Sequence, residues 1–122
     1  MVECFSIDDS YKAAKAIRLK KYILVCCEQG MVTMDIDGKH YEIPENHLIT
    51  ITSGQYQRIA ACTGKAVVLS FTFDYFCKDD QDIELIFYNG LFCHFDENEV
   101  LDIGRQSEIP QLLHQIQEEL QL

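Results

Sequence analysis

Histidine and cysteine side chains are the groups in this sequence that could bind a metal ion. The neighbouring pair Cys93-His94 could begin a zinc site together with Cys77, since zinc is held by thiolate and imidazole donors. No second pair at zinc-finger spacing accompanies it, which argues against such a site. His40 and His47 could instead complete an atypical metal set with His94 or Cys93. The chain would then be a small metalloenzyme.

Sequence motifs of other catalytic sites are absent. The chain has no G-x-S-x-G, no phosphate-binding P-loop and no H-E-x-x-H, and nothing suggests a Ser/His/Asp set. Its six cysteines form no C-x-x-C and follow no secretory signal, so we expect reduced thiols in a cytoplasmic protein. The adjacent Cys26 and Cys27 should point to opposite faces of a strand, which favours packing over redox sensing. We therefore expect no catalytic residues.

The charge of the chain is strongly negative and unevenly distributed. Lys and Arg total 10 against 20 Asp and Glu, giving a formal net charge of −10. Half of the basic residues lie between Lys12 and Lys21, whereas residues 74–119 contain only Lys78 and Arg105 as cations. Nucleic-acid binding requires concentrated positive charge, so this chain is not expected to bind DNA by itself. Its apolar runs are too short to span a bilayer, so no membrane partner is expected.

The clearest local element is a β-hairpin over residues 31–43. Asp37-Gly38 is typical of a two-residue type I′ turn, and the residues on either side alternate between apolar and polar. Pairing outward from the turn predicts three cross-strand pairs: Met34 with Tyr41, Val32 with Ile43, and Asp35 with His40. The first two pairs share an apolar face and the third lies on the solvated face.

Further short strands are expected through residue 103. Tyr22–Glu28 is an apolar run that Gly30 should end. The other predicted strands are residues 47–52, 56–62, 66–73, 83–88, 91–95 and 100–103, with turns at 53–54, 63–64 and 89–90. Residues 1–20 leave two options: a short helix capped by Ser10, or a loop that enters a first strand at Ile17. Several short strands at this spacing favour a sandwich or barrel.

The C-terminal residues change from strand to helix periodicity. Ser107 can cap a helix over residues 107–122. Large aliphatic residues recur there at helical spacing: Ile109, Leu112, Leu113, Ile116 and Leu120. No Gly or Asn closes the helix, and Glu118 and Glu119 lie where its dipole prefers cations, so we expect a longer helix cut short here. The apolar stripe must be covered by the barrel, by a second subunit, or by both.

Two sets of residues resemble a known family. The strand ending at Gly30, the Asp37-Gly38 hairpin and the strand ending at Ser53-Gly54 resemble the cupin double-stranded β-helix. The segments FCKDD (76–80) and IELIFYNGLFCHF (83–95), followed by the helix, are similar to N-terminal domains of AraC-family (arabinose-operon) regulators from gut and oral Bacteroidetes. The resemblance covers about residues 17–122. It implies a mainly β fold, a jelly-roll barrel over about 17–103 with a C-terminal helix, in a single regulatory domain over residues 1–122.

Metal-binding cupins carry a ligand set that this chain lacks. In them a His-x-His precedes a Glu that lies seven residues before a Gly, and another His follows a second Gly by three residues. With Gly30 and Gly54 as these glycines, the four ligand positions are Ile17, Leu19, Ile23 and Gln57. A single amide does not provide the donors that a first-row metal requires. We therefore expect neither a metal nor another cofactor.

The same register predicts an apolar barrel interior. The residues expected to face inward are Ile17, Leu19, Ile23, Val25, Cys27, Gln57, Ile59, Ala61, Val67, Leu69, Phe71 and Phe73. The candidate ligand pocket is formed by five of them: Ile23, Val25, Cys27, Gln57 and Phe71. A sugar site needs several polar groups, and this lining provides mainly Gln57. Either the ligand is apolar, or the interior is filled core.

The resemblance implies a function that agrees with the charge. We expect a non-catalytic bacterial domain that senses an effector, forms a homodimer through the helix residues named above, and signals to a helix-turn-helix DNA-binding domain absent from this chain. DNA would be contacted only through that second domain. The main alternative is a stand-alone small cupin enzyme with the atypical metal set. A third possibility is a structural interaction module without a ligand.

Overall fold

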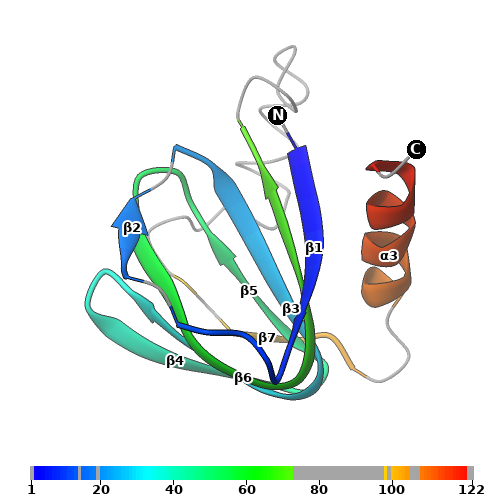
Figure 1. The fold of residues 1–122 in the computed structure, drawn as a ribbon, viewed down its shortest axis with the longest axis horizontal. Helices are drawn as coiled ribbons and strands as arrows, with labels where there is room; N and C mark the ends of the chain where they lie inside the picture. The colour runs from blue at the N-terminus through cyan, green and yellow to red at the C-terminus, as the bar shows by residue number, and fades with distance from the viewer. Residues whose placement is uncertain are drawn as a thin grey trace.

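An antiparallel sheet and one helix make up the described part of the protein (Figure 1). The computed structural model describes residues 2–13, 15–18, 20–72, 98, 100–104 and 108–120. Within these residues the elements are β1 (Val2–Asp8), β2 (Ile17–Arg18), β3 (Tyr22–Ile36), β4 (Lys39–Pro44), β5 (His47–Ile51), β6 (Tyr56–Phe71), β7 (Leu101–Asp102) and α3 (Ile109–Leu120). The sheet order is β1-β6-β3-β5-β7, with β2 also paired to β6 and β4 to β3.

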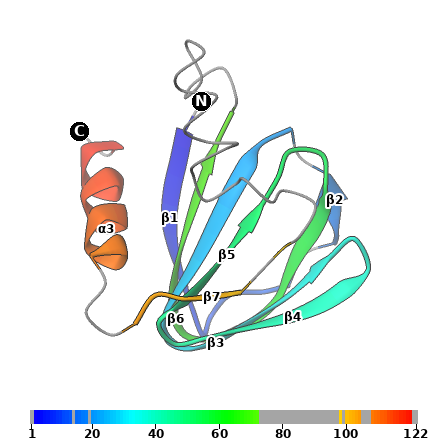
Figure 2. The same cartoon turned by 180° about the vertical axis from the view of Figure 1, so that it is seen from behind.

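Two long strands, β3 and β6, pair with each other along their length and bend together, so that each contributes to both walls of the barrel (Figures 1 and 2). One wall contains β1, β5, β7 and residues 22–27 and 66–71 of the long strands. The other contains β2, β4 and residues 31–36 and 56–63. Gly30 and Gly64 pair at the bend, with φ of +81° and +92°. A Cβ on either glycine would overlap the backbone of the opposite strand, so the bend requires glycine at both positions.

The predicted hairpin is confirmed. Asp37 and Gly38 both have positive φ, 49° and 82°, as a type I′ turn requires. All three predicted pairs occur in the β3–β4 ladder, including Asp35 opposite His40. The His40 Nδ1 lies 3.1 Å from the Asp35 Oδ1, on the solvated face.

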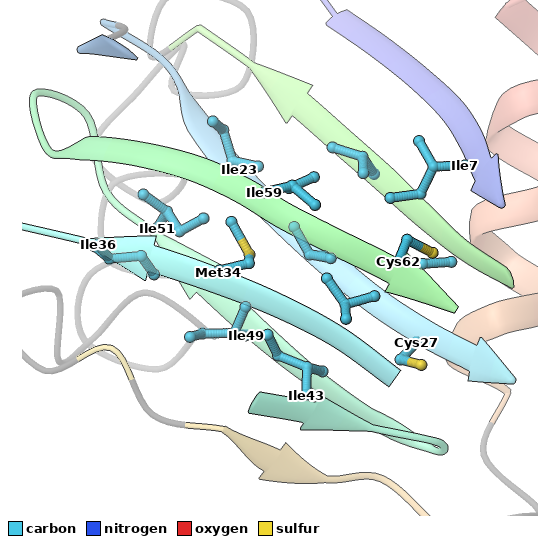
Figure 3. Packing of buried hydrophobic residues seen from close by; sticks show 14 residues of the cluster. Ile7, Ile23, Cys27, Met34, Ile36, Ile43, Ile49, Ile51, Ile59 and Cys62 are labelled. Atoms are coloured by element: carbon cyan, nitrogen blue, oxygen red, sulfur yellow. The ribbon is translucent and has the colours of Figure 1, made fainter. Parts of the chain in front are cut away.

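Apolar side chains form three clusters. The two larger ones lie on opposite sides of the first wall, and the third joins Tyr22 to Phe71. The largest cluster lies between the two walls (Figure 3), where Val25, Val32, Met34 and Ile43 are completely buried. The second cluster lies outside the barrel, beneath α3, and contains Leu24, Cys26, Leu48, Val67 and Leu113. Because alternate residues of a strand face opposite sides, the apolar run at the start of β3 supplies both of the larger clusters.

Several predicted boundaries differ from the structure. Gly30 and Gly64 do not end strands, because the chain bends through them while pairing continues. Residues 2–8 form β1, so the sheet begins well before Ile17, and Ser10 caps no helix. A helix follows the barrel as predicted, from Ile109. The predicted strands 83–88 and 91–95, the turn at 89–90 and the Ser107 cap lie outside the described residues.

The fold class is confirmed as mainly β, a jelly-roll barrel of antiparallel strands with a C-terminal helix. Within the described residues, no helix has both the length and the apolar character needed to cross a bilayer.

Candidate functional site

A cavity of about 210 Å³ opens between the walls of the barrel, beside β1 and β2. Its apolar surface comes from Ile23 and Val25 of β3 and from Ile59 and Val68 of β6. These four residues are at most 7% exposed. They face one another because the bend in the long strands brings both stretches of β6 against the same inner face of β3.

Two buried polar side chains, Gln57 and Ser70, also line the cavity. They are 9% and 7% exposed, and no other polar residue of the described part is buried. Neither side chain hydrogen-bonds to another described residue. Buried polar groups in proteins nearly always have a partner, either protein or ordered water. Both residues line the cavity, where water or another small molecule could bond to the amide and the hydroxyl.

Charged side chains surround this lining. Lys15, Lys21, Arg58 and Glu3 all border the cavity. The Lys21 Nζ lies 4.0 Å from a Glu3 carboxylate oxygen, at the outer limit of an ion pair. The Arg58 Nε lies 3.2 Å from the Asp35 Oδ2. The cavity thus combines apolar walls, two polar groups and a rim in which cations predominate.

Three of the four positions that correspond to cupin metal ligands converge here. Ile17 pairs directly with Gln57 in the β2–β6 ladder, and both line the cavity together with Ile23. The fourth position, Leu19, lies outside the described residues. None of the three has a side chain suited to a transition metal.

The histidines of the proposed alternative metal set do not come together in the described part of the chain. His40 contacts Asp35, and the His47 Nδ1 lies 2.9 Å from the carbonyl oxygen of Glu45. Within the described residues, no three His, Cys, Asp or Glu side chains are arranged to hold a metal ion. Cys77, Cys93 and His94 lie outside those residues.

The inward-facing register predicted for the second half of β6 is wrong. In the β3–β6 ladder Ile59 pairs with Met34 and Ala61 pairs with Thr33, so β6 contains one additional residue between these pairs. Side-chain direction alternates along a strand. This bulge therefore changes which residues of β6 face the barrel interior after Ile59. Ala61 is consequently exposed, and the residues that face inward are Cys62, Ala66, Val68 and Ser70.

Two of the five predicted pocket residues are therefore not in the lining. Phe71 lies outside the barrel, where its ring stacks on Tyr22 with a centroid distance of 5.7 Å. Val67 and Leu69, predicted on the same face as Phe71, belong to the outer clusters. Cys27 faces the barrel interior but does not line the cavity, and Phe73 is outside the described residues.

The residues that line the cavity but were missed by the sequence reasoning include Glu3, Lys15, Lys21, Arg58 and Ser70. Lys21 lies two residues before Ile23 on an extended segment, so period-two alternation could have identified it. Ser70 could not be found this way, because its direction depends on the bulge. Glu3 and Lys15 belong to a segment for which no strand register had been predicted.

Cys26 and Cys27 point to opposite sides of β3, as predicted. Cys27 is part of the inner cluster, and Cys26 is part of the outer one. Burial raises the pKa of each thiol to about 11. A thiol with such a pKa is almost entirely protonated at neutral pH, so neither residue is suited to nucleophilic or redox chemistry.

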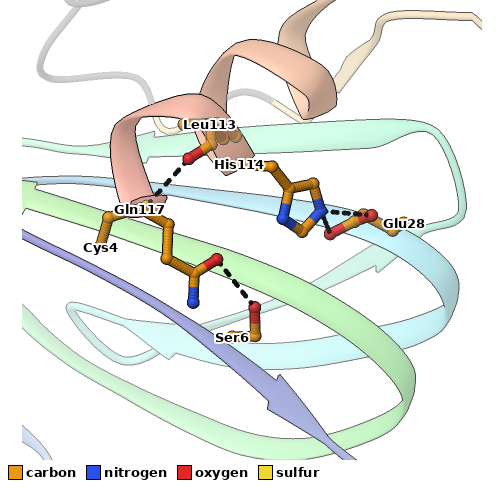
Figure 4. A network of polar contacts seen from close by, with 6 residues as sticks. All are labelled: Cys4, Ser6, Glu28, Leu113, His114 and Gln117. Atoms are coloured by element: carbon orange, nitrogen blue, oxygen red, sulfur yellow. Dashed lines mark hydrogen bonds and ion pairs between the residues drawn. The ribbon is translucent and has the colours of Figure 1, made fainter. Parts of the chain in front are cut away.

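Helix α3 lies on the outer side of β1 and β6 (Figure 4). Leu113 is 3% exposed and is packed against the outer cluster. The His114 Nε2 lies 2.9 Å and 3.0 Å from the two carboxylate oxygens of Glu28, and the Ser6 hydroxyl donates to the Gln117 side chain at 3.3 Å. These contacts dock the helix on its own barrel.

Only part of the predicted apolar stripe of the helix faces the barrel. Leu113 and Ile109 face the barrel, whereas Leu112 and Leu120 are 50% and 43% exposed. Ile116 is half-buried. The barrel therefore covers one side of the stripe and leaves the other side open.

Comparisons with solved structures show the same fold in other proteins. No family model and no curated protein matches this sequence. ToxT K231A from Vibrio cholerae strain SCE256 matches with a TM-score of 0.52 and 8% identity, over 98% of this chain and 46% of its own. The SPY1581 protein of unknown function from Streptococcus pyogenes has a TM-score of 0.50 and 17% identity, over 58% of this chain and 62% of its own. Clostridium difficile EutQ has a TM-score of 0.47 and 12% identity, over 66% of this chain and 58% of its own. The match covers less than two thirds of each of these proteins.

Proposed function

We propose that this chain is a non-catalytic regulatory domain of a bacterial transcription regulator, which binds a small effector and dimerises in the cytoplasm. A separate helix-turn-helix domain would contact DNA. The likeness to ToxT supports this proposal, because ToxT is an AraC-family protein and its matched region includes nearly all of this chain. The net charge of −10 also agrees with a domain that does not itself bind DNA.

The observation that carries the proposal is the alternation of β1 and β6 between the cavity and the helix. On β6, Val68 lines the cavity while the adjacent Val67 packs beneath α3. On β1, Phe5 lines the cavity while Ser6 hydrogen-bonds to Gln117 of the helix. A shift of either strand on effector binding would therefore move residues that support α3. This arrangement provides a direct route from the cavity to the helix.

The exposed side of α3 is the proposed dimer contact. Leu112, Ile116 and Leu120 recur at four-residue spacing, so they form one row along the helix. The helices of two subunits could bury these rows against each other, and a shift of α3 would then alter the relative placement of two attached DNA-binding domains.

A reporter assay tests dimerisation and signalling together. Residues 1–122 are fused to a DNA-binding domain that represses transcription only as a dimer. The fusion should repress, and the double variant Leu112→Glu with Leu120→Glu should lose repression while keeping its circular dichroism spectrum. The matched control, Gln111→Glu with Gln115→Glu, adds the same charge at exposed positions outside the row and should repress normally. No repression by the parent fusion, or equal loss in both variants, would contradict the proposed dimer.

A further inference from the structure

Half of the basic residues of this acidic chain lie in one short segment, residues 10–22. This basic segment contains no Asp or Glu and five cations: Lys12, Lys15, Arg18, Lys20 and Lys21. All except Lys21 are exposed, and none of these four takes part in an ion pair with another described residue. In a protein of net charge −10, the basic segment is a local region of positive charge.

Large apolar side chains are exposed beside the basic segment. Five such side chains are exposed in the described part of the protein, and two of them, Leu112 and Leu120, belong to the proposed dimer row. The other three are Phe5, Ile17 and Tyr56, which are 42%, 47% and 48% exposed. Neither the barrel nor the proposed dimer covers these three side chains.

The cations and the exposed apolar side chains lie together on the barrel. Ile17 belongs to the basic segment and borders the cavity together with Phe5 and Lys15. Tyr56 pairs with Arg18 in the β2–β6 ladder, and the Arg18 Cζ lies 4.4 Å from the centroid of the Tyr56 ring. Strand β2 and helix α3 are on opposite sides of the barrel in both views, so the surface around β2 is separate from the exposed row of α3 (Figures 1 and 2).

We propose that the basic segment and the apolar side chains beside it bind an anionic membrane surface. The lysines and Arg18 would lie among the lipid headgroups, where each cation contributes about fivefold to the affinity. Ile17 and Tyr56 would enter the boundary between headgroups and acyl chains, which accommodates aliphatic and aromatic side chains. A protein that lies on a membrane needs no spanning segment, so the short apolar runs of this chain do not argue against such binding.

Other anionic partners fit this surface less well. Interfaces between proteins are depleted in lysine and enriched in arginine, whereas four of the five cations here are lysine. Duplex DNA would be contacted mainly through its phosphate groups, which give Phe5 and Ile17 nothing apolar to pack against. A lipid bilayer presents both an anionic layer and an apolar one, and so matches both kinds of exposed side chain.

Sedimentation of the 122-residue chain with sucrose-loaded vesicles tests the proposal. The chain should bind vesicles of phosphatidylcholine and phosphatidylglycerol in equal parts, and it should not bind vesicles of phosphatidylcholine alone. Raising the ionic strength should release the chain, because the screening length falls from about 10 Å at about 0.1 M salt to about 3 Å at about 1 M.

Substitutions locate the contact. Lys20→Gln should weaken binding to the anionic vesicles about fivefold. The matched control Lys65→Gln removes the same charge from an exposed residue beside the bend, away from the start of β3, and should leave binding unchanged. Because both lysines are exposed, neither replacement should alter the melting temperature. Ile17→Ser should weaken binding about tenfold, because it removes an apolar side chain from the contact.

Three results would overturn the proposal. The first is a failure to bind the anionic vesicles, and the second is an equal loss of binding in the Lys20 and Lys65 variants. The third is binding to soluble polyglutamate but to neither kind of vesicle, which would assign the surface to an acidic protein partner. The reporter fusion separates each result from failure of the proposed dimer, because repression by the fusion does not require a membrane.

Discussion

Replacing Leu113 by alanine should detach α3 from the barrel, whereas the same replacement at the adjacent Leu112 should not. Leu113 is 3% exposed against the outer cluster, and Leu112 is 50% exposed. Removing three carbon atoms from a buried site costs about 2.4 kcal/mol at about 0.8 kcal/mol per methylene. The cavity left behind raises the total into the range of about 2–5 kcal/mol. At Leu112 half of that surface is already in water, so the cost should be about 1 kcal/mol.

Hydrogen exchange measured by mass spectrometry distinguishes loss of the helix from loss of the whole fold. A docking free energy reduced by about 2.4 kcal/mol should accelerate exchange of the α3 amides about fiftyfold in Leu113→Ala. The amides of β3 and β6 should change much less, because the inner cluster is untouched. Urea unfolding followed by circular dichroism gives the global stability of both variants. Equal exchange rates for α3 in the Leu113 and Leu112 variants would refute the placement of the helix.

Three further predictions concern the bend, the thiols and the helix contact. Gly64→Ala should lower the free energy of unfolding by about 1–3 kcal/mol more than Gly54→Ala in urea titrations. Both glycines have φ of +92°, but only at Gly64 would the added Cβ meet another strand. Cys26 and Cys27 should resist iodoacetamide at pH 8 until urea is added, as peptide mapping can show, and stability should fall as the pH rises from about 9 to about 11, because unfolded thiols ionise first. Glu28→Gln should weaken helix docking by a few tenths to about 1 kcal/mol, measured by exchange of the α3 amides, because the carboxylate that contacts His114 is lost.

The local sequence was sufficient to predict the hairpin and the helix. Asp37 and Gly38 accept the positive φ that a type I′ turn requires, and this turn determines the register of the residues on either side. The aliphatic spacing after residue 108 likewise predicts a helix, because one face must leave water. Both results depend on residues close together in the chain.

The lining of the cavity depended on the tertiary structure. Alternation predicted the inner face of β6 as far as Ile59, but the additional residue before Ala61 reversed it and placed Ser70 instead of Phe71 inside. No local pattern marks this bulge, because it arises where β6 pairs with a strand more than twenty residues away. Gly30 and Gly64 illustrate the same limit. Each glycine lies in a sequence that is typical of a turn. In the structure the two glycines instead form a continuous bend, because the two backbones approach so closely there that a Cβ would not fit.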